Sequence, residues 1–123
     1  MARAKDVTNV DGPRFKPTKN KKWAKRYGSH IRVGRRDYQI IFCEVILDEN
    51  GEQIAGLCDP NDHVLYVDVR REVEATLVHE IVHAEMFEAG FQQRPDWDRG
   101  VEEQICEVIS QGLSHAFTFR KRT

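Results

Sequence analysis

The chain has 123 residues, which is enough for one domain with one hydrophobic core and too few for two. Its composition is 40% hydrophobic and 32% charged with a formal net charge of -1, as in an ordinary globular protein. It has no apolar run long enough to cross a bilayer and no apolar segment after Met1 typical of a signal peptide. The three cysteines are widely spaced, which argues against a disulfide framework, so we expect a reduced, cytoplasmic protein.

The N-terminal segment is strongly basic. Residues 1–28 contain nine Lys and Arg against two Asp, a balance of +7. Residues 1–20 lack apolar periodicity and are expected to be extended or disordered, whereas Trp23 and Tyr27, four apart, predict a short helix that docks on the core. We therefore divide the chain into a basic arm, 1–28, and a single domain, 29–123. Such an arm could bind nucleic acid or an acidic partner, although a solvated terminus without a binding role is the simpler interpretation.

Several short segments after the arm have the composition of β-strands and are separated by turns. They cover residues 31–33, 38–47, 54–58 and 63–69. Asn50-Gly51 predicts a tight turn, because this pair tolerates positive φ. Since the segments follow each other through short turns, we expect an antiparallel sheet of three to four strands.

Two helices are predicted in the second half of the chain. Between Arg71 and Ala89 the apolar residues recur at helical spacing, and Gly90 is the expected stop. A loop with Trp97, expected to cover the edge of the core, leads to a second helix from Val101 to Ala116 with one broad apolar face. The predicted fold is α+β, a small antiparallel sheet packed on the first helix and a second, C-terminal helix.

The first helix carries an H-E-x-x-H sequence formed by His79, Glu80 and His83. Residues four apart lie on one face of a helix, so His79 and His83 can direct two imidazoles at one ion. Glu80 lies about 100° further round the helix and could take a proton from a water held by that ion. This pattern is typical of zinc metallopeptidases.

A catalytic zinc needs a third protein ligand, and the second helix offers Glu102, Glu103 and Glu107. Glu102 is nearer the apolar face, which predicts a more buried carboxylate. Glu103 and Glu107 belong to a stripe of small and polar residues, which suits the wall of a metal site and equally an ordinary solvated helix face. Spacing alone leaves the choice open.

The chain resembles the gluzincin metallopeptidases of thermolysin type. The residues that carry the resemblance are Leu77-Val-His-Glu-Ile-Val-His-Ala84, Ala89-Gly90 and Glu103-Gln-Ile-Cys-Glu107. The short chain, and the strand–turn–strand before the first helix, are more similar to the minimal HExxH proteins of phages and mobile elements, related to the ImmA/IrrE-type peptidases. The resemblance covers roughly residues 30–116.

The resemblance implies a role for each matching residue of the second helix. Glu103 would be the third zinc ligand, Cys106 the small position, and Glu107 the acid that supports a ligand histidine. Glu107 departs from the family pattern, which has Asp there, so its longer side chain makes that supporting role less direct.

The expected activity is hydrolysis of a peptide bond, with one Zn²⁺ per chain held by His79, His83 and Glu103 and with Glu80 as general base. The strand 63–69 is expected to pair with an extended peptide substrate. Side chains eligible to stabilise the oxyanion are those of Tyr66, His63 and His115, and the spacing selects none of them. The alternative is a non-catalytic, metal-stabilised module that binds nucleic acid or a protein through its basic arm.

Overall fold

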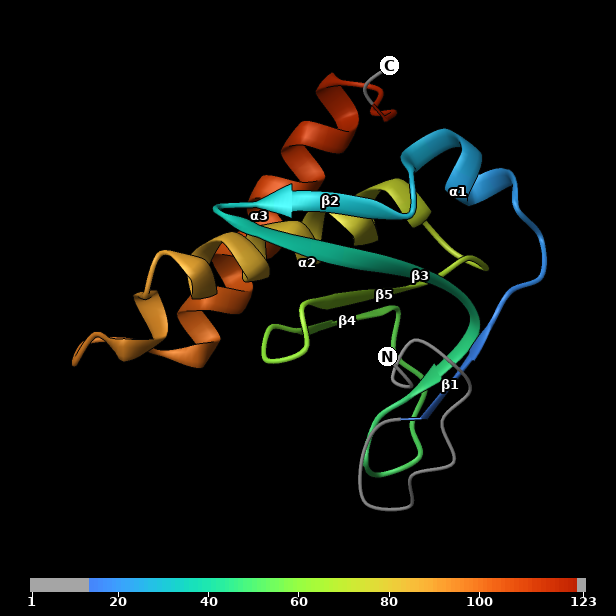
Figure 1. The fold of residues 1–123 in the computed structure, drawn as a ribbon. Helices are drawn as coiled ribbons and strands as arrows, with labels where there is room; N and C mark the ends of the chain where they lie inside the picture. Colours follow the sequence, from blue (N-terminus) through green and yellow to red (C-terminus); the bar gives the residue numbers. More distant parts are fainter. Residues whose placement is uncertain (1–13, 122–123) are drawn as a thin grey trace.

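A computed structural model describes residues 14–121 of the chain (Figure 1). The α+β class is confirmed: one mixed five-stranded sheet is accompanied by three helices in the described residues. In chain order the elements are β1 (Arg14–Pro17), α1 (Lys22–Tyr27), β2 (His30–Val33), β3 (Arg36–Leu47), β4 (Gly56–Asp59), β5 (Val64–Asp68), α2 (Val73–Glu88), the 3₁₀ helix η2 (Phe91–Gln93) and α3 (Arg99–Ala116). None of the described helices is long and apolar enough to span a membrane.

The sheet differs from the predicted antiparallel series. Its strand order is β1-β3-β5-β4, with β2 also paired to β3, and β3 and β5 run parallel. The prediction paired strands that are neighbours in the sequence, but β5 lies between β3 and β4 and leaves β4 at the edge. The reason is burial: all five residues of β5 are buried, and a strand that is apolar on both faces belongs in the centre of a sheet.

The described part of the basic arm packs on the domain. β1 pairs antiparallel with β3, and Phe15 is buried beside Tyr66. The predicted short helix is present as α1, and its aromatic residues Trp23 and Tyr27 pack against the core as expected. Residues 14–28 are therefore part of the domain, because β1 adds a strand to the sheet and the aromatic side chains of α1 pack on the core. The arm prediction for residues 1–13 lies outside the described residues.

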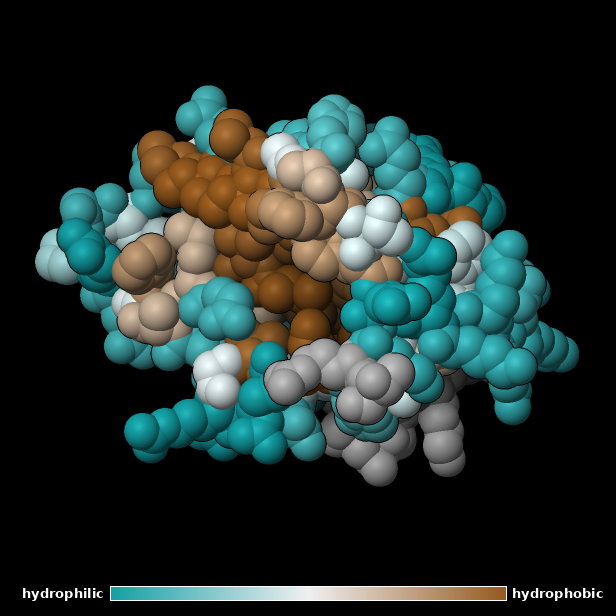
Figure 2. Space-filling model, turned by 90° about the horizontal axis from the view of Figure 1, so that it is seen from above, coloured by the Kyte–Doolittle hydropathy of each residue, from teal (hydrophilic) through white to brown (hydrophobic). Residues whose placement is uncertain are grey.

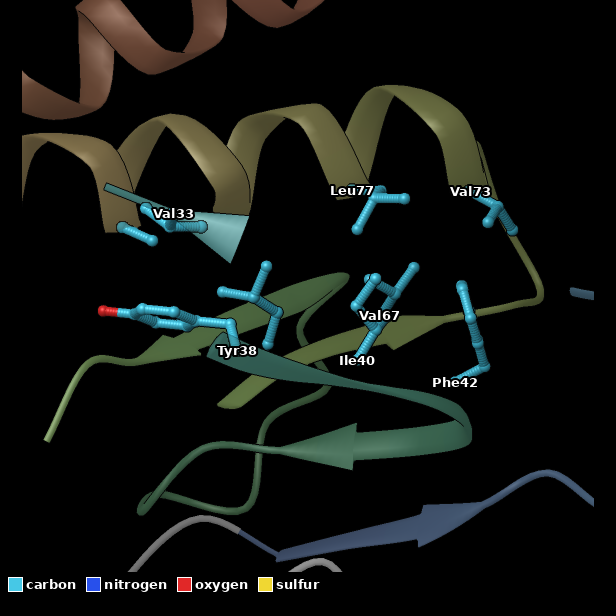
Figure 3. Close-up of a cluster of buried hydrophobic side chains, with 9 residues drawn as sticks. Val33, Tyr38, Ile40, Phe42, Val67, Val73 and Leu77 are labelled. Atoms are coloured by element: carbon cyan, nitrogen blue, oxygen red, sulfur yellow. The ribbon is translucent and has the colours of Figure 1, made fainter. Parts of the chain in front are cut away.

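The main core lies between the sheet and α2. Figure 3 shows Val73 and Leu77 of α2 pointing down onto Ile40, Phe42 and Val67 of the sheet. All five side chains are buried. At about 25 cal/mol per Å² of apolar surface removed from water, side chains of this size each contribute roughly 1.5–3 kcal/mol, so this layer fixes how α2 lies on the sheet.

Both predicted helices of the second half are confirmed. α2 ends where Gly90 adopts a left-handed φ of 81°, and α3 begins two residues before the predicted start. The earlier start follows from Asp98, whose side chain accepts a hydrogen bond from the Val101 backbone N–H and caps the helix. α2 lies on the sheet, and α3 packs against α2 (Figure 1).

The apolar face of α3 points away from α2. Val101, Ile105 and Val108 are 52%, 39% and 71% exposed, whereas the buried residues of the helix are Glu102, Cys106 and Ser110. Glu102 is buried, as predicted, but for a different reason: it faces α2 and is not covered by the helix's own apolar face. A polar layer therefore lies between the two helices.

Candidate metal centre

α2 presents the H-E-x-x-H residues to α3 because its opposite side is fixed to the sheet. Leu77 and Ala84 are buried in the core, which directs the far side of the helix towards α3. His79 and His83 lie there one turn apart, with side chains 18% and 15% exposed. Their ring centroids are 4.9 Å apart. The two rings therefore border the same space between the helices.

Glu103 of α3 enters that space. Its Oε1 lies 3.1 Å from His79 Nε2 and 3.2 Å from His83 Nε2. Ligand atoms that surround zinc tetrahedrally, each about 2.0–2.1 Å from the metal, are about 3.3 Å from one another, so this spacing fits a metal-binding triad. The three residues named from the sequence as ligands are brought together, and their binding of a metal stays a prediction.

The other nitrogen of each histidine meets a second carboxylate of α3. His79 Nδ1 lies 3.2 Å from Glu107 Oε1, and His83 Nδ1 lies 2.6 Å from Glu102 Oε2. A histidine that donates from Nδ1 keeps the lone pair of Nε2 free for a metal. Both rings are thus held in the orientation that points Nε2 at the shared space, and Glu107 reaches its ring despite its longer side chain.

Glu102 is itself held by the loop before α3. Trp97 Nε1–H donates to Glu102 Oε1 at 2.7 Å. Burial alone would raise the pKa of Glu102, but the hydrogen bonds from Trp97 and His83 outweigh it and keep the pKa below its usual value. An ionised carboxylate therefore supports His83. Trp97 does not cover the core edge as predicted, since its indole lines the cleft and fixes this acid.

Glu80 sits beside the triad, against the edge strand β4. Its side chain is buried, and burial together with the negative charge of Glu103 raises its pKa to about 8. A Cβ at Gly56 of β4 would come within 2.8 Å of Glu80 Oε2 and 2.7 Å of Thr76 Cγ2. Gly56 therefore gives the carboxyl group its room. A carboxyl group with a pKa in this range can both accept and return a proton near neutral pH.

A cleft of about 750 Å³ gives access to these residues. It is bordered by α2, by α3 and by residues 54–58, which include most of β4. β4 pairs with β5 alone among the described strands, so its outer edge is open for pairing. The expectation that 63–69 would pair with a peptide is wrong, because β5 is already hydrogen-bonded on both sides, to β3 and to β4.

The three oxyanion candidates lie away from the cleft. Tyr66 is buried on the other face of the sheet beside Phe15, and His63 packs on Tyr38. His115 borders a different hollow, beside α1. None of the three lines the cleft, so this prediction finds no support in their positions.

A second group of possible ligands, His83, Glu102 and Cys106, shares the same space. Burial, and next the charge of Glu102, raise the pKa of Cys106 to about 12, so its thiol keeps its proton at neutral pH. This group is the poorer metal site, because His83 and Glu102 are already paired with each other at 2.6 Å. Glu102 is better placed as the partner of His83 Nδ1.

Sequence reasoning missed two residues of the centre. The supporting role of Trp97 depends on a five-residue separation from Glu102 across a helix start, and the Asp98 cap was the only local signal for that start. The role of Gly56 depends on how closely α2 approaches β4, which no local pattern encodes. Comparisons of the chain with family models, with curated proteins and with solved structures returned no match.

Proposed function

We propose that this chain is a zinc metallopeptidase that uses Glu80 as its general base. The observation that supports the proposal best is the convergence of His79 Nε2, His83 Nε2 and Glu103 Oε1 within 4.8 Å of one another. Two neutral imidazoles and one carboxylate are a ligand set typical of catalytic zinc in peptidases. When bound there, zinc would supply a Lewis acid and lower the pKa of a water molecule in its open position.

The residues of the chain divide the remaining work. Glu80 accepts a proton from the attacking water and returns a proton to the leaving amine nitrogen as the peptide C–N bond breaks. Glu102 and Glu107 keep the two histidines oriented, through Nδ1, during the cycle.

The substrate is an extended peptide segment. The open edge of β4 runs along the cleft and offers backbone hydrogen bonds to a chain added as a further strand. The same edge brings the peptide backbone alongside Glu80, because Gly56 of β4 is in contact with that carboxyl group.

The experiment compares Glu80→Gln with Glu85→Gln, the same chemical change at an exposed position of the same helix. Zinc content is measured by elemental mass spectrometry, and cleavage is followed by mass spectrometry on a peptide library made from denatured proteins. We expect one zinc per chain in both variants, and cleavage reduced at least about a hundredfold only in Glu80→Gln. Full cleavage by zinc-loaded Glu80→Gln would contradict the mechanism.

The alternative is a non-catalytic module that binds nucleic acid through the basic segment. Lys16 pairs with Glu44 at 3.5 Å, and Arg26 pairs with Glu74 at 3.7 Å. Only these two basic side chains of residues 14–28 have acidic partners recorded within the domain, so the alternative stays a proposal for the test below. A zinc-loaded protein that cleaves no peptide in the library but binds DNA in a salt-sensitive way would favour this alternative.

A further inference from the structure

The hydrophobic surface of the molecule is concentrated on one part of the chain. Figure 2 shows hydrophobic residues gathered in a continuous area on the face that it displays. The exposed large hydrophobic side chains of the described residues all fall in their last third. Trp97 lines the cleft, and the others are Phe91, Val101, Ile105, Val108, Ile109, Leu113 and Phe117. Contiguous apolar surface of this kind marks an interaction site more often than a bare monomer surface.

α3 carries the centre of this surface. Val101, Ile105, Val108, Gly112 and Ala116 follow one another at intervals of four, three, four and four residues, which places them along one line of the helix. We call this line the outer face of α3.

The outer face carries no formal charge. All four charged residues of α3, namely Arg99, Glu102, Glu103 and Glu107, line the cleft on the other side of the helix. A partner that covers the outer face therefore meets no charge that would lose its hydration without a counter-charge.

We propose that the outer face of α3 binds the outer face of a second copy of this chain, with the two helices antiparallel. A two-fold contact brings the same surface against itself, so it requires a face that is complementary to itself. The outer face meets this requirement in charge, since it has none, and in size, since its bulky residues lie in the first half of the line and its small residues in the second half.

Antiparallel pairing about the middle of the line matches large residues with small ones. If Val108 lies opposite Ile109 of the second copy, the register brings Ile105 opposite Gly112 and Val101 opposite Ala116. A parallel arrangement would instead stack Ile105 on Ile105 and leave a gap at Gly112. The pattern of side-chain sizes thus selects the antiparallel form.

Gly112 is the residue that a lone monomer does not explain. Glycine inside a helix costs about 1 kcal/mol relative to alanine. A Cβ at Gly112 would meet nothing within 4 Å in the chain, so no intramolecular contact requires glycine there. The side chain of Ile105 from a second copy would occupy that space and would require the glycine.

The dimer leaves the metal centre open, because the outer face and the cleft lie on opposite sides of α3. An interface made by one helix per chain is small, below about 1,200 Å² in total, so we expect a dissociation constant in the micromolar range. The inference is independent of the proposed peptidase activity, and its tests use no activity measurement.

The first test measures mass against concentration by sedimentation velocity, for the full chain from about 1 to several hundred micromolar. We expect a reversible monomer–dimer equilibrium. Val108→Glu introduces a charge at the most exposed large hydrophobic side chain of the line and should leave only monomer over the same range. Gln93→Glu adds the same charge at an exposed position outside α3 and should dimerise as the unchanged protein does. An unchanged protein that stays monomeric throughout, or a dimer that persists in Val108→Glu, would overturn the proposal.

The second test fixes the orientation. In the antiparallel register, position 101 lies next to position 116 of the other copy, whereas the two copies of position 101 are about 22 Å apart at 1.5 Å per residue. A mixture of Val101→Cys and Ala116→Cys should give a disulfide-linked dimer under mild oxidation, and Val101→Cys alone should not. Crosslinking of Val101→Cys alone, without crosslinking of the mixture, would indicate parallel helices and contradict the register.

Discussion

Helices α2 and α3 are packed against each other, yet they bury different kinds of side chain. α2 buries aliphatic residues such as Leu77 against the sheet, where each is surrounded by other apolar side chains. α3 buries Glu102, Cys106 and Ser110, and it exposes its aliphatic residues. Both are α-helices, but α2 buries an apolar side against the sheet whereas α3 buries a polar side against α2.

This difference shows that a helix can bury its polar side when the polar groups on that side have hydrogen-bond partners. Burying a carboxylate without partners is expensive, but Glu102 receives hydrogen bonds from Trp97 and His83. The polar side of α3 can therefore face inwards, and its aliphatic side remains available for a partner. Three predictions test this contrast, and a fourth tests a buried carboxylate of the sheet; they follow in order of decreasing effect.

Leu77→Ala should have the largest effect, because it leaves a cavity between α2 and the sheet. We expect the free energy of unfolding to fall by about 2–5 kcal/mol. Val108→Ala removes an aliphatic side chain from the exposed side of α3 and should change it by less than about 0.5 kcal/mol in dilute monomer. Urea denaturation followed by circular dichroism measures the free energy of unfolding of both variants. Equal losses in the two variants would contradict the proposed difference between the helices.

Glu102→Gln tests the buried polar side of α3. The amide lacks the charge that supports His83, so zinc affinity should fall about 10–100-fold while the fold is kept. Glu107→Gln should cost less, because that carboxylate is exposed and lies further from its histidine, at 3.2 Å against 2.6 Å. Competition titration with a chelator gives both affinities. Unchanged zinc affinity in Glu102→Gln would show that this contact does not support the candidate metal centre.

Replacing glycine by alanine should lower the free energy of unfolding at Gly56, beside α2, and raise it at Gly112, on α3. Gly56→Ala brings a Cβ against Thr76 and Glu80 of α2 and should destabilise the fold by about 1–3 kcal/mol. Gly112→Ala on the open side of α3 should stabilise dilute monomer by up to about 1 kcal/mol. Thermal unfolding at low concentration compares them. Combining Gly56→Ala with Thr76→Ser, which removes Cγ2, should restore part of the loss, and no restoration would locate the strain elsewhere.

Arg70→Met should have the smallest effect and concerns a buried carboxylate outside the candidate metal centre. Burial alone would raise the pKa of Asp68, but hydrogen bonds from Arg70 outweigh it and hold the pKa below its usual value. The stabilisation is therefore present above the unfolded-state pKa of 3.8 and is lost as the pH falls through the lower folded-state pKa.

We expect Arg70→Met to be slightly less stable than the unchanged protein at pH 7, because Arg70 is half exposed and solvent weakens the pair, and to approach the unchanged protein as the pH falls below 4. Denaturant titrations from pH 7 to pH 3 measure the difference, and Arg35→Met at an exposed turn is the control. If the stability difference between Arg70→Met and the unchanged protein grew on acidification, the prediction would be wrong.

Several elements could be predicted because their signals are local. The helical spacing of apolar residues and the stop at Gly90 gave α2, and the four-residue separation of His79 and His83 placed them on one face of it. The α+β class followed from the change of period between strands and helices. The order of the strands was not predictable in this way, because β5 inserts between β3 and β4, which precede it in the chain.

The amino-acid sequence by itself determined which residues can share a helix face, since that depends only on helix geometry. It thereby defined the pair of imidazoles, the acid next to them and the outer face of α3. Only the tertiary structure decided that Glu103 reaches both Nε2 atoms while Glu102 and Glu107 reach the two Nδ1 atoms. The physical reason is that neighbouring carboxylates on one helix point about 100° apart, so the packing of α3 on α2 chooses which of them meets which nitrogen.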